Sequence, residues 1–137
     1  MSDRKPIGLL DTCTLIDFED IPESSLPVVS QICAITVAEL MLGVHMAKNP
    51  LERAGRITKL LTTNSNFDAL PFEEQALDAF NALVGYTVAI GRNPKPRKND
   101  LMIAATAMAN GMPLYTANAD GFKGLESMLD VIETRTV

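Results

Sequence analysis

Short apolar runs alternate along the chain with longer segments in which apolar residues recur every three or four positions. The first run, residues 7–10, is apolar apart from one glycine and stops at Asp11, which predicts a strand buried within a parallel sheet. The other apolar runs also predict strands, including one at the edge of the sheet. These further strands are expected at residues 30–35, 67–71, 114–116 and, at the edge, 131–133.

The segments between these runs have the 3.6-residue period of amphipathic helices. Asn99 is expected to cap one of them, and Gly111 to end it in a left-handed turn. A helical hairpin is expected on either side of Asn49-Pro50. The predicted helices cover residues 13–18, Thr36 to at least Val44, 51–63, 73–88 and 100–110, with loops at 19–27, 91–98 and 117–124.

The alternation of strands and helices predicts an α/β fold with a mostly parallel sheet and helices on both of its faces. The length of 137 residues favours a single domain, 1–137, and 47% hydrophobic residues are too many for a disordered chain. No apolar run approaches the length of a membrane span, and residues 1–6 lack the features of a secretory signal. We therefore expect a cytoplasmic protein without membrane attachment.

Several kinds of chemistry are disfavoured by what the sequence lacks. The chain has one histidine, His45, so a Ser-His-Asp or Cys-His mechanism would depend on that residue alone. Neither a Gly-x-Gly-x-x-Gly motif nor a Gly-Lys-Ser/Thr phosphate loop is present. Cys13 and Cys33 do not have a zinc-site spacing, and we expect both to be reduced, partly buried thiols.

Four acidic residues occupy positions where strands hand over to helices: Asp11, Glu39, Asp100 and Asp120. In a right-handed crossover the amino terminus of a helix lies at the same edge of the sheet as the carboxyl ends of the strands. Carboxylates brought together at this edge repel one another unless a cation holds them, and Mg²⁺ or Mn²⁺ prefers oxygen ligands. The four positions therefore predict a divalent-metal site.

Each acid also has a purely structural explanation. Glu39 completes a capping-box pattern with Thr36, and Asp100 can complement the positive end of a helix. Asp11 can cap the short helix that follows it, and Asp120 can be an ordinary turn residue. The metal-site hypothesis depends on all four lying at one edge, which separate capping roles do not require.

A basic cluster precedes Asp100 directly and consists of Arg92, Lys95, Arg97 and Lys98. Beside an acidic metal site, these cations suggest a groove for a nucleic-acid backbone, although a solvated loop is the simpler interpretation. The net charge of −5 does not exclude such a partner, because carboxylates that hold a divalent metal no longer repel phosphate.

Four segments of the chain resemble the signature segments of PIN-domain proteins, and most closely those of VapC-type toxins. They are residues 9–16, 35–40, 99–107 and 114–122. The resemblance implies an α/β/α sandwich and a Mg²⁺- or Mn²⁺-dependent endoribonuclease. It further implies a homodimer and inhibition by a VapB-type antitoxin, whose carboxy-terminal segment lies in the active-site groove.

The resemblance also assigns roles to individual residues. Asp11, Glu39 and Asp100 match the acidic metal ligands of the family. Thr14 matches a small polar residue near the first aspartate, expected to orient a ligand or water, and Thr116 matches the polar residue that ends the fourth strand.

In its last segment the chain departs from the family pattern. Many relatives have an aspartate directly before the aromatic residue, where this chain has Gly121 before Phe122. Asp120 can take that role with help from Asn118, but the resemblance then implies a weaker second metal site.

The sequence therefore favours metal-dependent hydrolysis of phosphodiester bonds in RNA. One alternative is a catalytically idle PIN-like module that binds RNA or a protein. Another is a metal-dependent phosphatase, although that chemistry usually needs a second aspartate two residues after the first, where this chain has Cys13.

Overall fold

A parallel sheet forms the centre of the molecule. The computed structural model describes residues 4–136 and contains four strands in the order β2-β1-β3-β4, with every neighbouring pair parallel. The predicted α/β class with a parallel sheet is therefore confirmed. The strands are β1 (Ile7–Leu10), β2 (Val29–Gln31), β3 (Leu114–Thr116) and β4 (Val131–Glu133).

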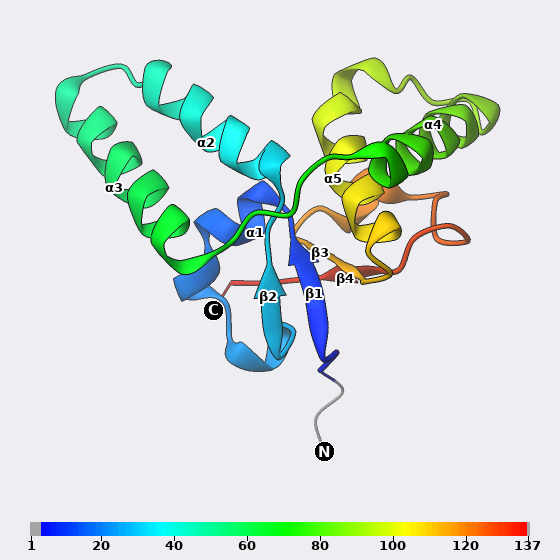
Figure 1. The fold of residues 1–137 in the computed structure, drawn as a ribbon, viewed down its shortest axis with the longest axis horizontal. Helices are drawn as coiled ribbons and strands as arrows, with labels where there is room; N and C mark the ends of the chain where they lie inside the picture. Colours follow the sequence, from blue (N-terminus) through cyan, green and yellow to red (C-terminus); the bar gives the residue numbers. More distant parts are fainter. Residues whose placement is uncertain (1–3, 137) are drawn as a thin grey trace.

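The helices form two arms that diverge above the sheet in a V (Figure 1). One arm is the hairpin of α2 (Ala34–His45) and α3 (Pro50–Asn66), and the other consists of α4 (Glu74–Ala89) and α5 (Lys98–Ala109). The short α1 (Thr12–Ile16) lies at the base of the V. Four 3-10 turns complete the described chain: η1 (Phe18–Asp20), η2 (Glu23–Ser25), η3 (Lys95–Arg97) and η4 (Ala119–Phe122).

Successive residues of β1 point to opposite faces of the sheet and build two hydrophobic cores. Leu9 belongs to the core formed with α4 and α5, whereas Leu10 belongs to the core on the side of α1 and α2. Both side chains are fully buried. Helix α5 is buried over much of its circumference, as a helix must be when it is covered by both the sheet and α4. The predicted placement of helices on both faces is confirmed.

Two of the predicted strands are wrong in extent or in kind. The segment 30–35 is not one strand, because β2 ends at Gln31 and Cys33 already caps α2. The segment 67–71 forms only one bridge, at Leu70, whose backbone bonds to both Ile32 and Ala34. Pro71 follows immediately and has no N–H with which to extend the pairing.

Helices α2 and α5 begin earlier than the capping residues suggested. Helix α2 starts at Ala34, so Thr36 lies inside its first turn and is not the N-cap. Helix α5 starts at Lys98 directly after the η3 turn, so Asn99 is likewise inside the helix. Of the two cysteines, Cys33 is buried as expected, but Cys13 is exposed. Within residues 4–136, no helix combines the length and apolar character needed to cross a membrane.

Candidate active site

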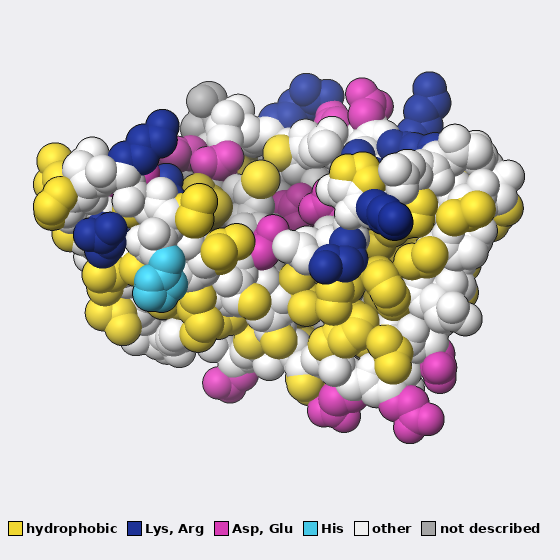
Figure 2. All heavy atoms as spheres, turned by 90° about the horizontal axis from the view of Figure 1, so that it is seen from above, with side chains coloured by type: hydrophobic (Ala, Val, Ile, Leu, Met, Phe, Trp, Pro, Cys, Tyr) yellow, Lys and Arg dark blue, Asp and Glu magenta, His cyan; other side chains and the backbone are white. Residues whose placement is uncertain are grey.

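The carboxyl ends of β1 and β2 point to the base of the V, and the predicted site residues are found there (Figure 1). Asp11 follows β1, Glu39 lies in the second turn of α2, and Asp100 lies in the first turn of α5. Figure 2 shows acidic side chains in the middle of this face, with Lys or Arg side chains beside them.

Asp11 is held in a fixed orientation by two hydrogen bonds. Its Oδ1 accepts from the backbone N–H of Thr14 at 2.9 Å, which makes it the N-cap of α1, and its Oδ2 accepts from the hydroxyl of Thr116 at 2.5 Å. The Thr116 oxygen in turn accepts from the backbone N–H of Asn118 at 3.0 Å. The hydroxyl of Thr14 does not face the carboxylate but pairs with Thr134, so Thr14 positions Asp11 through its backbone.

Glu39 is held by side chains that the sequence interpretation did not assign to the site. The hydroxyl of Thr12 donates to Oε1 of Glu39 at 2.5 Å, and Nδ2 of Asn99 lies 3.5 Å from Oε2. Because Cys33 is the N-cap of α2, the capping-box interpretation of Thr36 and Glu39 is wrong. The adjacency of Thr12 to Asp11 and of Asn99 to Asp100 was the available signal for these residues.

Asp11, Glu39 and Asp100 are close enough to act on one another electrostatically. Burial raises the pKa of Asp100, the neighbouring Glu39 and Asp11 raise it further, and the Arg97 guanidinium opposes this shift. Burial raises the pKa of the Cys13 thiol as well, and the same three carboxylates contribute. The sheet edge therefore gathers three of the four predicted acids into one local field.

The donor chemistry fits a hard divalent cation, because the grouped side chains offer carboxylate oxygens. Within residues 4–136, however, no three His, Cys, Asp or Glu side chains are arranged closely enough to hold a metal ion as they stand. Each grouped carboxylate instead has a protein donor: Thr116 for Asp11, Thr12 for Glu39 and Arg97 for Asp100. An ion bound here would take over part of the role of these donors.

Asp120 is not part of this group. It is exposed in the η4 turn and lines a separate pocket with Tyr86, Arg92 and Lys123. It is also not among the charges that shift the pKa of Asp100. Its role as a fourth metal ligand stays a prediction from sequence.

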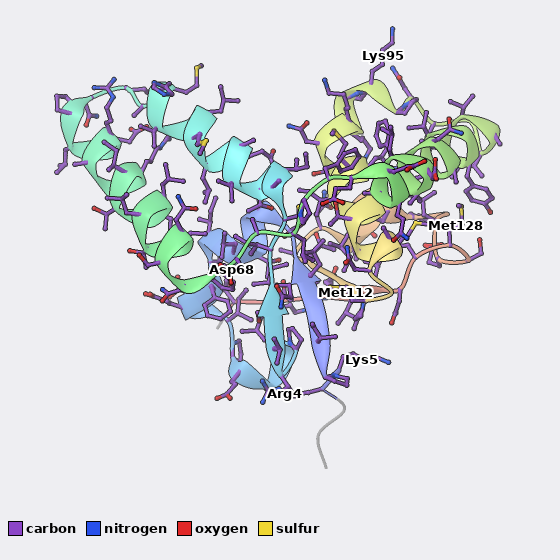
Figure 3. The ribbon with its side chains drawn as sticks, viewed as in Figure 1. Arg4, Lys5, Asp68, Lys95, Met112 and Met128 are labelled. Atoms are coloured by element: carbon purple, nitrogen blue, oxygen red, sulfur yellow. The ribbon has the colours of Figure 1, made fainter. Side chains whose placement is uncertain are left out.

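The four residues of the basic cluster have different surroundings. Arg92 donates to the backbone carbonyl of Lys123 at 2.7 Å, and Arg97 points inward to an ion pair with Asp100. Lys95 and Lys98 are exposed, and Lys95 extends away from the protein at the top of its arm (Figure 3). The two lysines are therefore the members of the cluster that are open to a ligand.

Comparison with known protein sequences gives the same picture as the geometry. The family profile of the PIN domain matches residues 9–126. The chain is 31% identical over 134 residues to Ribonuclease VapC5 of Mycobacterium tuberculosis, with 96% of each chain covered. It is 29% identical over 101 residues to Ribonuclease VapC1 of Rickettsia felis, covering 71% of each.

Two solved structures also have this fold. A member of the VapBC family of toxin–antitoxin systems, VapBC-5 from M. tuberculosis, superposes with a TM-score of 0.82 at 30% identity, covering 96% of this chain and 99% of the other. FitAcB from Neisseria gonorrhoeae superposes with a TM-score of 0.72 at 27% identity, covering 92% of this chain and 96% of the other.

We expect Thr116→Val to destabilise the protein by about 1–3 kcal/mol. Valine has nearly the same shape, but it removes the donor to Asp11 and the acceptor for the Asn118 amide. Urea unfolding followed by circular dichroism measures the change, with the exposed Thr136→Val as the matched control. Equal effects of the two variants would contradict this assignment.

We expect Asp100→Asn to stabilise the metal-free protein at neutral pH. The raised pKa of Asp100 means that the folded state disfavours the charged carboxylate. The folded protein is thus relatively most stable when Asp100 is protonated, and this contribution is lost as the pH rises through the raised pKa. The variant should gain over wild type at pH 7 and lose that advantage in acid.

Unfolding in urea with EDTA at several pH values measures this difference. Asp68→Asn, at an exposed position near the end of α3 (Figure 3), makes the same chemical change outside the site. A destabilised Asp100→Asn variant at pH 7 would show that the ion pair with Arg97 outweighs burial and carboxylate repulsion.

Proposed function

Because the chain belongs to the PIN domain family, we propose that it is a metal-dependent endoribonuclease and the toxin of a VapBC-type pair. The observation that carries this proposal is the grouping of Asp11, Glu39 and Asp100 at one edge of the sheet. The similarity to Ribonuclease VapC5 along 96% of both chains supports the reaction class.

Asp11, Glu39 and Asp100 would hold one or two Mg²⁺ or Mn²⁺ ions, which when bound supply a Lewis acid for phosphodiester hydrolysis. The protein's part is to orient these ligands. Thr116 and the Thr14 amide fix both oxygens of Asp11. Side chains that orient a metal ligand in this way commonly contribute 10- to 100-fold to metal affinity or activity.

Lys95 and Lys98 would bind the RNA backbone beside the site. Both are exposed near the amino end of α5, the helix that carries Asp100. Lysine contacts to phosphate position a nucleic acid without reading its bases. We therefore expect any base preference to come from other parts of the groove.

The antitoxin partner would bind along the inner side of the α2–α3 arm. A largely apolar pocket of about 520 Å³ lies there, and its lining includes both Glu39 and Thr12 of the site as well as Ile16, Leu40 and Arg56. A peptide segment in this pocket would cover apolar surface and reach the carboxylates. The similarity to the VapBC-5 toxin–antitoxin structure supports a VapB-type partner.

The central test is RNA cleavage by the purified protein. We expect Asp11→Asn to lower the cleavage rate at least about 100-fold in Mg²⁺ or Mn²⁺ without unfolding the protein, because it removes a ligand charge. EDTA should abolish cleavage by wild type, and added Mn²⁺ should restore it. Asp68→Asn is the matched control, since its side chain is exposed outside the site.

The outcome also separates the alternatives. RNA binding without cleavage would indicate a binding module, and turnover of a small phosphomonoester would indicate a phosphatase. An Asp11→Asn variant as active as wild type would remove Asp11 from the mechanism.

We expect the double variant Lys95→Ala/Lys98→Ala to weaken RNA binding and to flatten its salt dependence. Each lost contact to a single strand should lower the slope of log K against log salt by about 0.7. Fluorescence anisotropy in an Asp11→Asn background measures binding without cleavage. Lys48→Ala, at an exposed position between α2 and α3, is the control, and an unchanged slope in the double variant would argue against the groove.

A further inference from the structure

Gly121 leaves space at the site that a neighbouring side chain fills. A β-carbon built at position 121 would lie 2.8 Å from Cζ of Arg97 and 3.1 Å from Nδ2 of Asn118. The described glycines with positive φ are Gly91, Gly111 and Gly124, so the backbone at 121 does not itself require glycine. The space taken by the Arg97 guanidinium is what requires it.

The Arg97 guanidinium is fixed in this space from several sides. Its Nη2 lies 3.3 Å from Oδ2 of Asp100, and its Cζ lies 5.7 Å from the ring centroid of Phe122. The side chain is 22% exposed, and Nε is buried without a hydrogen-bond partner among the described residues. Burying a guanidinium with an unpaired N–H is unfavourable, so its pairing with Asp100 is the contact that offsets this cost.

A guanidinium in this place supplies a permanent positive charge to the carboxylate group. Two-metal phosphodiesterases place their ions about 3.5–4 Å apart, so that both ions share the central carboxylates. The Arg97 nitrogen already lies within that range of Asp100. A second divalent ion would have to displace a partly buried cation and would be repelled by it.

Resting on the proposed nuclease function, we propose that Arg97 replaces the second metal ion of this site, so that the chain binds a single divalent ion near Asp11 and Glu39. Asp100 then faces one metal ion and one guanidinium. Arg97 is accordingly a charge-supplying residue of the site and not a contact of the basic cluster to RNA. The pair Arg97 and Gly121 acts as one unit, because the room for the guanidinium exists only without a side chain at 121.

The number of bound Mn²⁺ ions tests the proposal without any activity measurement. Titration of the folded protein, with free Mn²⁺ counted by electron paramagnetic resonance, should give one ion per wild-type chain. The double variant Arg97→Ala/Gly121→Asp removes the guanidinium and supplies a carboxylate in the same space, and it should bind two. Lys48→Ala removes one exposed charge outside the site and should bind one.

The outcomes separate this inference from the nuclease proposal. Two ions on wild type, or one on the double variant, would overturn the role of Arg97 and leave the nuclease assignment intact. No bound ion on wild type, together with no RNA cleavage, would overturn the proposed function itself.

A double-mutant cycle tests the shared space by stability alone. Gly121→Ala should destabilise the wild-type chain, because its methyl group meets the guanidinium, and should cost much less in an Arg97→Ala background. Urea unfolding of the four proteins measures both costs. Equal costs in the two backgrounds would show that the two positions do not compete for space.

Discussion

Repulsion between carboxylates gathered at one sheet edge is the constraint to which the surrounding residues respond. Neutral hydroxyls from Thr116 and Thr12 stabilise two of the carboxylates, and a permanent cation, Arg97, stabilises the third. Hydroxyl donors yield readily to a cation, because an ion offers the same oxygens a stronger interaction. The guanidinium is partly buried and does not yield as readily, so the three positions are not equivalent toward a metal.

The hydrophobic cores determine how rigidly this edge is built. Asp11 continues directly from the buried Leu9 and Leu10, and Asp100 lies beside the fully buried Leu101 on a helix packed on several sides. Glu39 stands on α2, which contacts α5 as well as α3. Two of the three carboxylates are therefore anchored in the core, whereas the third is carried by an arm that also borders the apolar pocket.

The sequence was sufficient to place backbone positions at the site but not to orient every side chain there. The rule that helix starts and strand ends share an edge correctly grouped Asp11 with Asp100, because it depends only on topology. It could not show that Arg97 turns inward or that Thr12 supports Glu39, because both depend on contacts between segments far apart in sequence. The strand expected around Leu70 was wrong because its apolar pattern lacked a partner with free ladder groups.

Asp120 illustrates why a role does not pass freely to the neighbouring position. The η4 turn advances by about 120° per residue, so adjacent side chains in it point in clearly different directions. Asp120 accordingly lines the pocket of Arg92, while position 121 faces Arg97. A carboxylate at 120 thus cannot take the place of one at 121 unless the turn rewinds. With glycine at 121, the charge that a carboxylate would share with a second metal is absent, and the guanidinium in that space leaves Asp100 partly neutralised instead.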